Sequence, residues 1–183
     1  MKHKPVLETE LKLRIPATGP YRPLLEALGF REAISAQTET SVLWDRDGQL
    51  RAAGSALRTR TYAGHAWLTW KGPKVPDPIL KIRPERETEI ADAAALEAIL
   101  RALGFEPVMR MEKVRAVWAR EELEACLDET PFGSYLELEG EPQAIRAAME
   151  GLGLAPDRAE PRSYPELYRA NGMGGLPGKD SPA

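Results

Sequence analysis

The chain has 183 residues, of which 43% are hydrophobic and 29% are charged, and its formal net charge is −3. This composition is typical of a globular protein, and the slight negative charge gives no general attraction to nucleic acid. No apolar run reaches membrane-spanning length, the N-terminus lacks the apolar core of a signal peptide, and the single cysteine excludes an internal disulfide framework. We therefore expect a cytoplasmic protein with one domain over residues 1–171 and a flexible Gly/Pro-rich tail over 172–183.

The first predicted element is a strand over residues 6–15, with the sequence VLETELKLRI. Its charged residues stand at every second position, and Leu, Thr or Ile fill the positions between them. Successive side chains of a strand point to opposite faces, so one face of this strand is largely apolar. The other face carries Glu8, Glu10, Lys12 and Arg14.

Apolar residues at helical spacing predict four helices. Three of them end in Leu-Gly followed by an apolar residue, which is typical of a helix capped by glycine. The fourth has Pro165 in its first turn, where the missing N–H costs nothing. The predicted helices cover residues 20–30, 92–105, 141–154 and 163–170.

Seven more strands are predicted between the helices, and glycine-containing turns separate several of them. Eight strands with few helices favour an α+β fold with a mainly antiparallel sheet, which could close into a barrel. The seven further strands cover residues 40–46, 55–63, 66–72, 79–90, 109–119, 123–129 and 134–140.

Charged residues at every second position recur on six of these strands. An ordinary sheet with one solvated face would explain any single strand. The set as a whole, however, is almost purely ionisable and contains little of the Ser, Thr, Gln or Asn that solvated faces usually carry. If the sheet closes, these charges line its interior. They are Arg58 and Arg60, Lys71, Lys81 with Arg83, Glu85, Glu87 and Glu89, Lys113 and Arg115, Asp128, and Glu137 with Glu139.

So many buried charges are costly without a partner, and a polyphosphate with a divalent metal would satisfy both signs. Lysine and arginine pair with phosphate oxygens, and carboxylates hold Mg²⁺ or Mn²⁺. Glu8 and Glu10 are two residues apart and can reach one ion, and Glu137 and Glu139 repeat that geometry. We therefore expect a polyphosphate as the partner, with Mg²⁺ or Mn²⁺ as the cofactor.

The same residues, in this order, resemble the signature of the CYTH superfamily, the triphosphate tunnel metalloenzymes. The stretch EPRSYPELY, residues 160–168, is similar to the end of bacterial class IV adenylate cyclases and their relatives. The resemblance implies an eight-stranded antiparallel closed β-barrel, the triphosphate tunnel, with helices packed outside. It implies that Lys12, Glu8 and Glu10 are catalytic. The implied metal ligands are Glu8, Glu10, Asp128, Glu137 and Glu139.

The resemblance also implies which residues bind the triphosphate. Glu85, Glu87 and Glu89 remain uncertain tunnel acids, because the family's acidic strand varies and Pro84 interrupts it here. The implied substrate-binding residues are Lys12, Arg58, Arg60, Lys71, Arg83, Lys113 and Arg115.

Two reactions stay open from the resemblance. Family members hydrolyse inorganic triphosphate, thiamine triphosphate or nucleoside triphosphates, or they cyclise ATP to cyclic AMP and pyrophosphate. A non-catalytic polyphosphate-binding module is a lesser alternative, and we expect no nucleic-acid or membrane partner and a monomer or homodimer. The chain departs from its relatives at Trp44-Asp45-Arg46, where they often have an aromatic residue followed by Asp-Thr, so the identity of the substrate stays open.

Several other residues have a structural explanation. His3, His65 and Cys126 are isolated from other catalytic residue types, and we expect no chemistry from them. We expect Trp67, Trp70 and Trp118 to pack between barrel and helices. Tyr164 and Tyr168 are expected to dock the last helix, which could cover one mouth of the tunnel.

Overall fold

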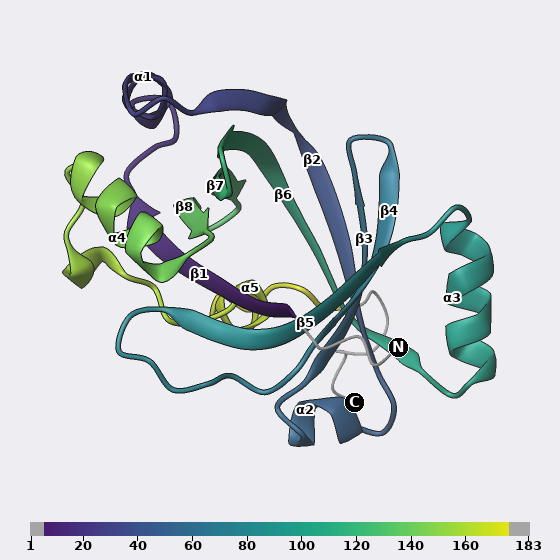
Figure 1. The fold of residues 1–183 in the computed structure, drawn as a ribbon. Coiled ribbons are helices and arrows are strands. Elements are labelled where there is room, and N and C mark those ends of the chain that lie inside the picture. The colour runs from purple at the N-terminus through teal and green to yellow at the C-terminus, as the bar shows by residue number, and fades with distance from the viewer. Residues whose placement is uncertain (1–5, 176–183) are drawn as a thin grey trace.

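Eight antiparallel strands close into a barrel in the computed structural model, which describes residues 6–175 (Figure 1). Around the barrel the strands follow the order β1-β5-β4-β3-β2-β6-β7-β8, and β8 pairs again with β1. The predicted α+β fold and closed barrel are therefore confirmed. The strands are β1 Val6–Ile15, β2 Arg31–Asp45, β3 Ala56–Tyr62, β4 His65–Lys71, β5 Lys81–Glu89, β6 Glu106–Arg120, β7 Leu123–Thr130 and β8 Gly133–Glu139.

Five α-helices lie outside the strands or at their ends within the described residues. The four predicted helices are all present, and the short α2 is an addition. Its position follows from Asp45, whose carboxylate accepts the backbone N–H groups of Leu50 and Arg51 at 2.9 and 3.1 Å. The helices are α1 Tyr21–Ala27, α2 Gln49–Ala52, α3 Ala93–Ala102, α4 Pro142–Gly151 and α5 Tyr164–Ala170, with a 3₁₀ turn η1 at Pro156–Arg158.

Strand β2 is much longer than predicted, because its first nine residues were not recognised as a strand. Residues 31–38 are almost all exposed and show no alternation of apolar and polar side chains. They are nevertheless held as a strand by pairing with β6, with two register irregularities between Glu32 and Gln37. Backbone pairing, which sequence alone does not display, thus brings Glu39 into the barrel wall.

The main apolar core lies outside the barrel. The alternate residues of β1, β7 and β8 that point away from the interior are buried beneath α1 and α4. Leu11 and Leu138 on the strands and Ile145 on α4 have no exposed surface. Trp118 belongs to this core, as predicted. Trp67 does not, because it packs on Tyr62, Val117 and Cys126. The outer core fixes the wall whose other face carries the charges.

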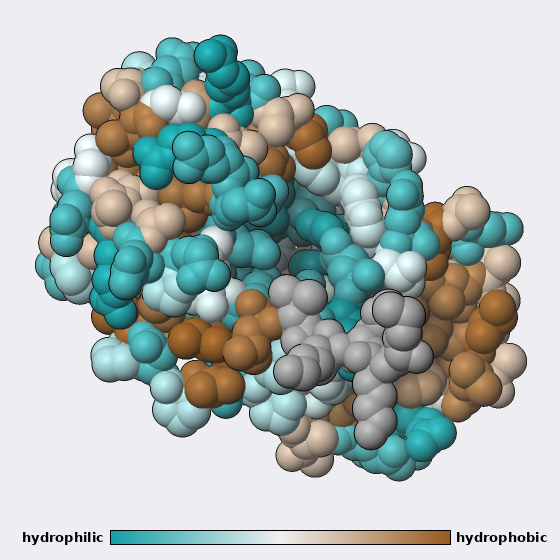
Figure 2. All heavy atoms as spheres, viewed as in Figure 1, coloured by the Kyte–Doolittle hydropathy of each residue, from teal (hydrophilic) through white to brown (hydrophobic). Residues whose placement is uncertain are grey.

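Figure 2 shows a hollow lined by hydrophilic side chains and, away from it, an apolar patch over α3. The patch includes Ile99 and Leu103, which are more than half exposed. None of the helices in the described part of the chain is long and apolar enough to cross a membrane. Most of the predicted flexible tail lies outside the described residues. Within its described part, the Gly174 carbonyl accepts a hydrogen bond from Arg110 N at 3.2 Å.

Candidate active site

The barrel encloses a cavity of about 660 Å³ whose wall carries most of the predicted site residues. The predicted residues in its lining come from every strand of the barrel except β2 and β7, and α5 contributes Tyr164. Two predicted residues are not in the lining: Asp128 is fully buried behind it, and Glu89 is exposed beside His65. The predicted residues that line the cavity are Glu8, Glu10, Lys12, Arg58, Arg60, Lys71, Arg83, Glu85, Glu87, Lys113, Arg115, Glu137 and Glu139.

Strand register decides which charges face each other. Glu10 on β1 stands opposite Lys81 on β5 and opposite Glu139 on β8. Lys12 stands opposite Glu137. Because the side-chain period is two, the pleat keeps all of these groups on the interior face.

One wall of the cavity holds a lysine between two glutamates. Lys71 Nζ lies 2.6 and 2.7 Å from the two oxygens of Glu8, and 2.7 Å from Glu85 Oε2. Burial and a hydrogen bond to Glu85 raise the pKa of Glu8 to about 9, despite the opposing effect of Lys71. The two carboxyl groups therefore share one proton at neutral pH, and a cation entering this wall would release it.

Lys12 lies deeper and is almost completely buried. Its Nζ donates to the Arg162 carbonyl at 3.1 Å, lies 3.4 Å from Glu137 Oε1, and sits 3.7 Å from the centre of the Tyr164 ring. Burial lowers the pKa of Lys12 to about 7, in opposition to Glu137. Lys12 can thus take up or give up a proton near neutral pH.

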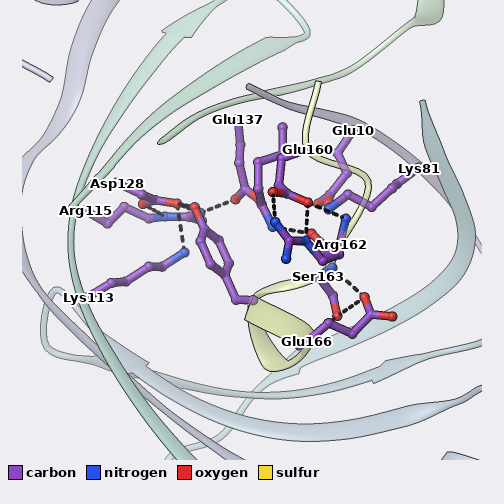
Figure 3. Close-up of polar contacts among 12 residues, drawn as sticks. Glu10, Lys81, Lys113, Arg115, Asp128, Glu137, Glu160, Arg162, Ser163 and Glu166 are labelled. Atoms are coloured by element: carbon purple, nitrogen blue, oxygen red, sulfur yellow. Dashed lines mark hydrogen bonds and ion pairs between the residues drawn. The ribbon is translucent and has the colours of Figure 1, made fainter. Parts of the chain in front are cut away.

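Asp128 is the centre of a buried network (Figure 3). It accepts hydrogen bonds from Arg115 Nε and Nη2 at 2.7 and 2.6 Å, from Lys113 Nζ at 3.0 Å, and from the Tyr164 hydroxyl. Arg115 also contacts Glu137. Both oxygens of Asp128 are therefore engaged, and the residue would have to exchange these contacts to reach an ion.

Sequence reasoning did not assign a role to four of the residues found here. Lys81 had the right parity in a predicted strand, and it pairs with Glu10. Glu39 fell just outside the strand predicted over 40–46. Tyr164 does more than dock its helix, because its ring lies under Lys12 and also under Lys113 at 4.2 Å. Arg162 supplies the carbonyl that holds Lys12.

Tyr168 docks α5 as predicted. Its hydroxyl bonds to the backbone of Glu112 on β6, accepting from the N–H at 3.1 Å and donating to the carbonyl. The ring packs edge-on against Phe132. The anchor holds α5 where Tyr164 reaches the cavity.

The cavity wall becomes apolar where β2, β3 and β6 pass α2. Trp44 belongs to this part, although it is 1% exposed and its indole N–H donates to Thr59 Oγ1 at 2.9 Å. The guanidinium of Arg101 covers its ring at 5.1 Å. The cavity therefore has a charged section and an apolar section; the apolar lining comprises Leu43, Trp44, Leu50, Ala56, Leu57, Val108 and Met111.

The carboxylates of β1 and β8 fit a divalent cation by their donor chemistry. Glu8, Glu10, Glu137 and Glu139 line one cavity on adjacent strands, and Mg²⁺ and Mn²⁺ take carboxylate oxygens. In residues 6–175 no three acidic, histidine or cysteine side chains are yet gathered around one point, because most carboxylates turn toward lysine or arginine. Glu139 is the exception.

Glu139 has no hydrogen bond or ion pair from its side chain to any other described residue, and the residues opposite it are Glu10 and Glu124. Like charges directly opposite each other destabilise a sheet. Burial raises the pKa of Glu139 to about 7, and the charge of Glu10 adds to the effect. A bound cation would relieve the repulsion between Glu139 and Glu10.

Glu139→Gln is expected to stabilise the metal-free protein at pH 8. The folded-state pKa is about 7 against a usual 4.5, so the folded protein binds this proton more tightly, and stability falls as the pH rises from about 4.5 to 7. Glu139 is only partly desolvated and keeps part of its surface exposed at the cavity wall, so solvent screening limits the gain to about 1 kcal/mol or less. Thermal unfolding of the parent and the variant in EDTA, at pH 5 and at pH 8, measures this difference in stability.

Glu122→Gln in the exposed β6–β7 turn is the matched control, and its melting temperature should follow that of the parent both in EDTA and in Mg²⁺. In Mg²⁺, Glu139→Gln should gain less stability than the parent. A lower melting temperature for Glu139→Gln at pH 8 in EDTA would contradict the proposed repulsion.

Known proteins resemble this chain over almost its full length. The family model described as CYTH domain matches residues 7–164. A protein of Methanocaldococcus jannaschii named "Putative adenylate cyclase" is 31% identical over 173 residues, which cover 88% of this chain and 98% of the relative.

Solved structures share the fold. A protein of Vibrio parahaemolyticus, described as a "putative adenylate cyclase", aligns with a TM-score of 0.79 at 20% identity over 90% of this chain and 98% of its own. A protein from Hippeastrum, described as a "putative adenylyl cyclase" with a dominant triphosphatase activity, aligns with a TM-score of 0.65 at 24% identity over 93% of this chain and 98% of its own.

Proposed function

The chain belongs to the CYTH domain family, and from this premise we propose that it is a divalent-metal-dependent enzyme that hydrolyses a triphosphate-bearing small molecule. The observation that carries the proposal is a pair of buried, unsatisfied arginine donors inside the barrel. The Nε groups of Arg58 and Arg60 are buried and have no hydrogen-bond partner among the described residues. Buried donors of this kind call for an acceptor, and phosphate oxygens are the acceptors that arginine binds best.

Several of the cations in the cavity are held by carboxylates that a triphosphate could replace. Lys71 pairs with Glu8 and Glu85, and Arg60 lies 3.1 Å from Glu87. On binding, each cation would exchange a carboxylate oxygen for a phosphate oxygen, so little charge would have to be newly desolvated. Lys12, Arg58, Arg60, Lys71, Arg83, Lys113 and Arg115 are the proposed binding residues, and the structure adds Lys81.

The carboxylates freed in this exchange, together with Glu139, are the proposed metal ligands. Glu8, Glu10, Glu137 and Glu139 would hold Mg²⁺ or Mn²⁺, which neutralises phosphate charge and lowers the pKa of bound water. Asp128 remains a predicted fifth ligand. Its present contacts support a second task, which is to hold Arg115 and Lys113 in place.

Lys12 is the proposed proton-handling group. With a pKa of about 7 it is only partly protonated at neutral pH, and its Nζ faces Glu137 at 3.4 Å. A negatively charged phosphate beside Nζ would raise this pKa, so Lys12 would take up a proton when the substrate binds. Catalysis needs a group that changes protonation near the working pH, and Lys12 meets that requirement.

The apolar section of the cavity bears on the choice of substrate. Inorganic triphosphate would leave Leu43, Leu57 and Met111 without a contact, whereas a nucleoside or thiamine group would cover them. The same observation supports the second candidate, adenylate cyclase. In that reaction the 3′-hydroxyl of ATP attacks the α-phosphorus and pyrophosphate leaves with the bond electrons, while the hydroxyl proton passes to a base.

Product analysis distinguishes the two reactions. The purified protein is incubated with Mg²⁺ or Mn²⁺ and, separately, with inorganic triphosphate, thiamine triphosphate and ATP, and the products are resolved by phosphorus NMR and chromatography. We expect orthophosphate, turnover that stops in EDTA, and no cyclic nucleotide. Cyclic AMP with pyrophosphate would establish the cyclase instead. Absence of both turnover and triphosphate binding would refute the proposed function.

A further inference from the structure

Glu39 on β2 is a buried carboxylate surrounded by cations. It is 3% exposed, and its register partner on β6 is Lys113. Its oxygens lie 3.6 Å from Lys113 Nζ, 3.7 Å from Arg115 Nε and 3.6 Å from Arg60 Nη1. Three proposed phosphate-binding residues therefore face one fixed negative charge.

The contacts of Glu39 differ in kind from those of the other interior carboxylates. Asp128 accepts several hydrogen bonds of 3.0 Å or less, and Glu8 is within 2.7 Å of Lys71. Every cation around Glu39 lies beyond hydrogen-bonding distance, and Glu39 Oε2 is buried without a hydrogen-bond partner among the described residues. Within residues 6–175, only Ser41 Oγ donates a hydrogen bond to Glu39, at 3.4 Å to Oε1. The interaction is a through-space attraction between charges.

Glu39 is not needed to hold these cations in place. Arg115 and Lys113 are bound by Asp128, and Arg60 is bound by Glu87. Barrel order also separates β2 from β1, where Glu8 and Glu10 lie, by three strands on either side. Neither anchoring of the cations nor the proposed metal site therefore accounts for a carboxylate at this position.

A fixed anion among cations lowers their affinity for every other anion. Polyphosphates carry several negative charges and still bind to a cluster with one internal carboxylate, but they bind less tightly than to the bare cations. For an enzyme this matters at the end of the cycle, because a pyrophosphate or orthophosphate product held by bare buried cations would leave slowly. Weaker binding of products allows turnover.

We propose that Glu39 is an internal counter-anion, which competes with phosphate for Arg60, Lys113 and Arg115 and so keeps the affinity for polyphosphate low enough for release. This inference rests on the proposed triphosphate-binding function and assigns one residue a role in it. It predicts that removing the negative charge of Glu39 tightens the binding of polyphosphate.

Calorimetric titration of inorganic triphosphate and of pyrophosphate in EDTA tests the inference. Glu39→Gln keeps the shape and removes the charge, and we expect Kd for both anions to fall about tenfold. Glu39→Asp keeps the charge and should bind within about threefold of the parent. In the metal-loaded enzyme, Glu39→Gln should lower kcat and be inhibited more strongly by pyrophosphate.

Glu112→Gln is the matched control, because Glu112 lies on the same strand pair but points outward into solvent. Its Kd should equal that of the parent. If the parent binds triphosphate and Glu39→Gln binds it equally or more weakly, the counter-anion is refuted while the proposed function stands. If the parent binds no triphosphate with or without Mg²⁺, the proposed function fails, and the inference fails with it.

Discussion

Glu10→Gln is expected to lower metal-dependent turnover roughly 1,000-fold, because a metal-ion contribution to catalysis is worth several kcal/mol. Glu10 is a proposed ligand that is firmly held in its charged form. Burial would raise its pKa, but Lys81 and the other lysines around it hold the pKa at about 2. The carboxylate is therefore ionised at any working pH and stands directly across from Glu139.

The fold should survive this substitution, because the glutamine carbonyl can still accept a hydrogen bond from Lys81. Turnover is measured against Mn²⁺ concentration, and metal binding is measured separately by calorimetry. Glu89→Gln is the control, since Glu89 lies on β5 outside the cavity in an exposed pair with His65. A loss of turnover in Glu10→Gln that leaves Mn²⁺ affinity unchanged would argue against Glu10 as a ligand.

The barrel and the charged interior were predictable because one pattern carries both. Alternation of charged and apolar residues in β1 predicts a strand with one charged face, and its repetition on the other strands leaves few places for the charges except inside. Pro84 did not disturb the pattern. The β4–β5 ladder ends at the pair Lys71–Glu85, so the residue without an N–H falls just beyond it.

Glu39 and Tyr164 could not be placed from sequence, for two different reasons. The part of β2 that precedes Glu39 has no apolar alternation, so only its pairing with β6 makes it a strand. Tyr164 sits in a helix whose packing face could be predicted, but the depth to which its ring enters the barrel depends on how α5 is anchored. Tyr168 and the Arg162 carbonyl provide that anchor through contacts more than 50 residues apart in sequence.

The alternation of charged residues also could not predict which acidic and basic side chains pair with each other. Parity alone placed Asp128 with the other acids, and it could not show that Asp128 lies behind the cavity wall. Three partners from β6 and α5 converge on it in space. Its burial is therefore a property of the assembled barrel.

Asp128→Ala is expected to be the most destabilising single change in the interior. The substitution would leave Arg115 and Lys113 buried with weaker partners, and breaking a buried ion pair in this way costs about 3–5 kcal/mol. For a domain of this size the melting temperature should fall by about 10 °C or more. The melting temperature of Asp128→Asn should fall less, because the asparagine can still accept hydrogen bonds.

Scanning calorimetry in EDTA and again in Mg²⁺ separates the two roles of Asp128. If Asp128 mainly holds Arg115, Lys113 and Tyr164, the loss in Asp128→Ala appears in full in EDTA and changes little when Mg²⁺ is added, since the metal meets the remaining carboxylates. If Asp128 is chiefly a metal ligand, the variant should resemble the parent in EDTA and lose only the stabilisation that Mg²⁺ gives. The contacts of both Asp128 oxygens favour the first result, because a carboxylate already bound to three donors gives up those bonds to reach an ion.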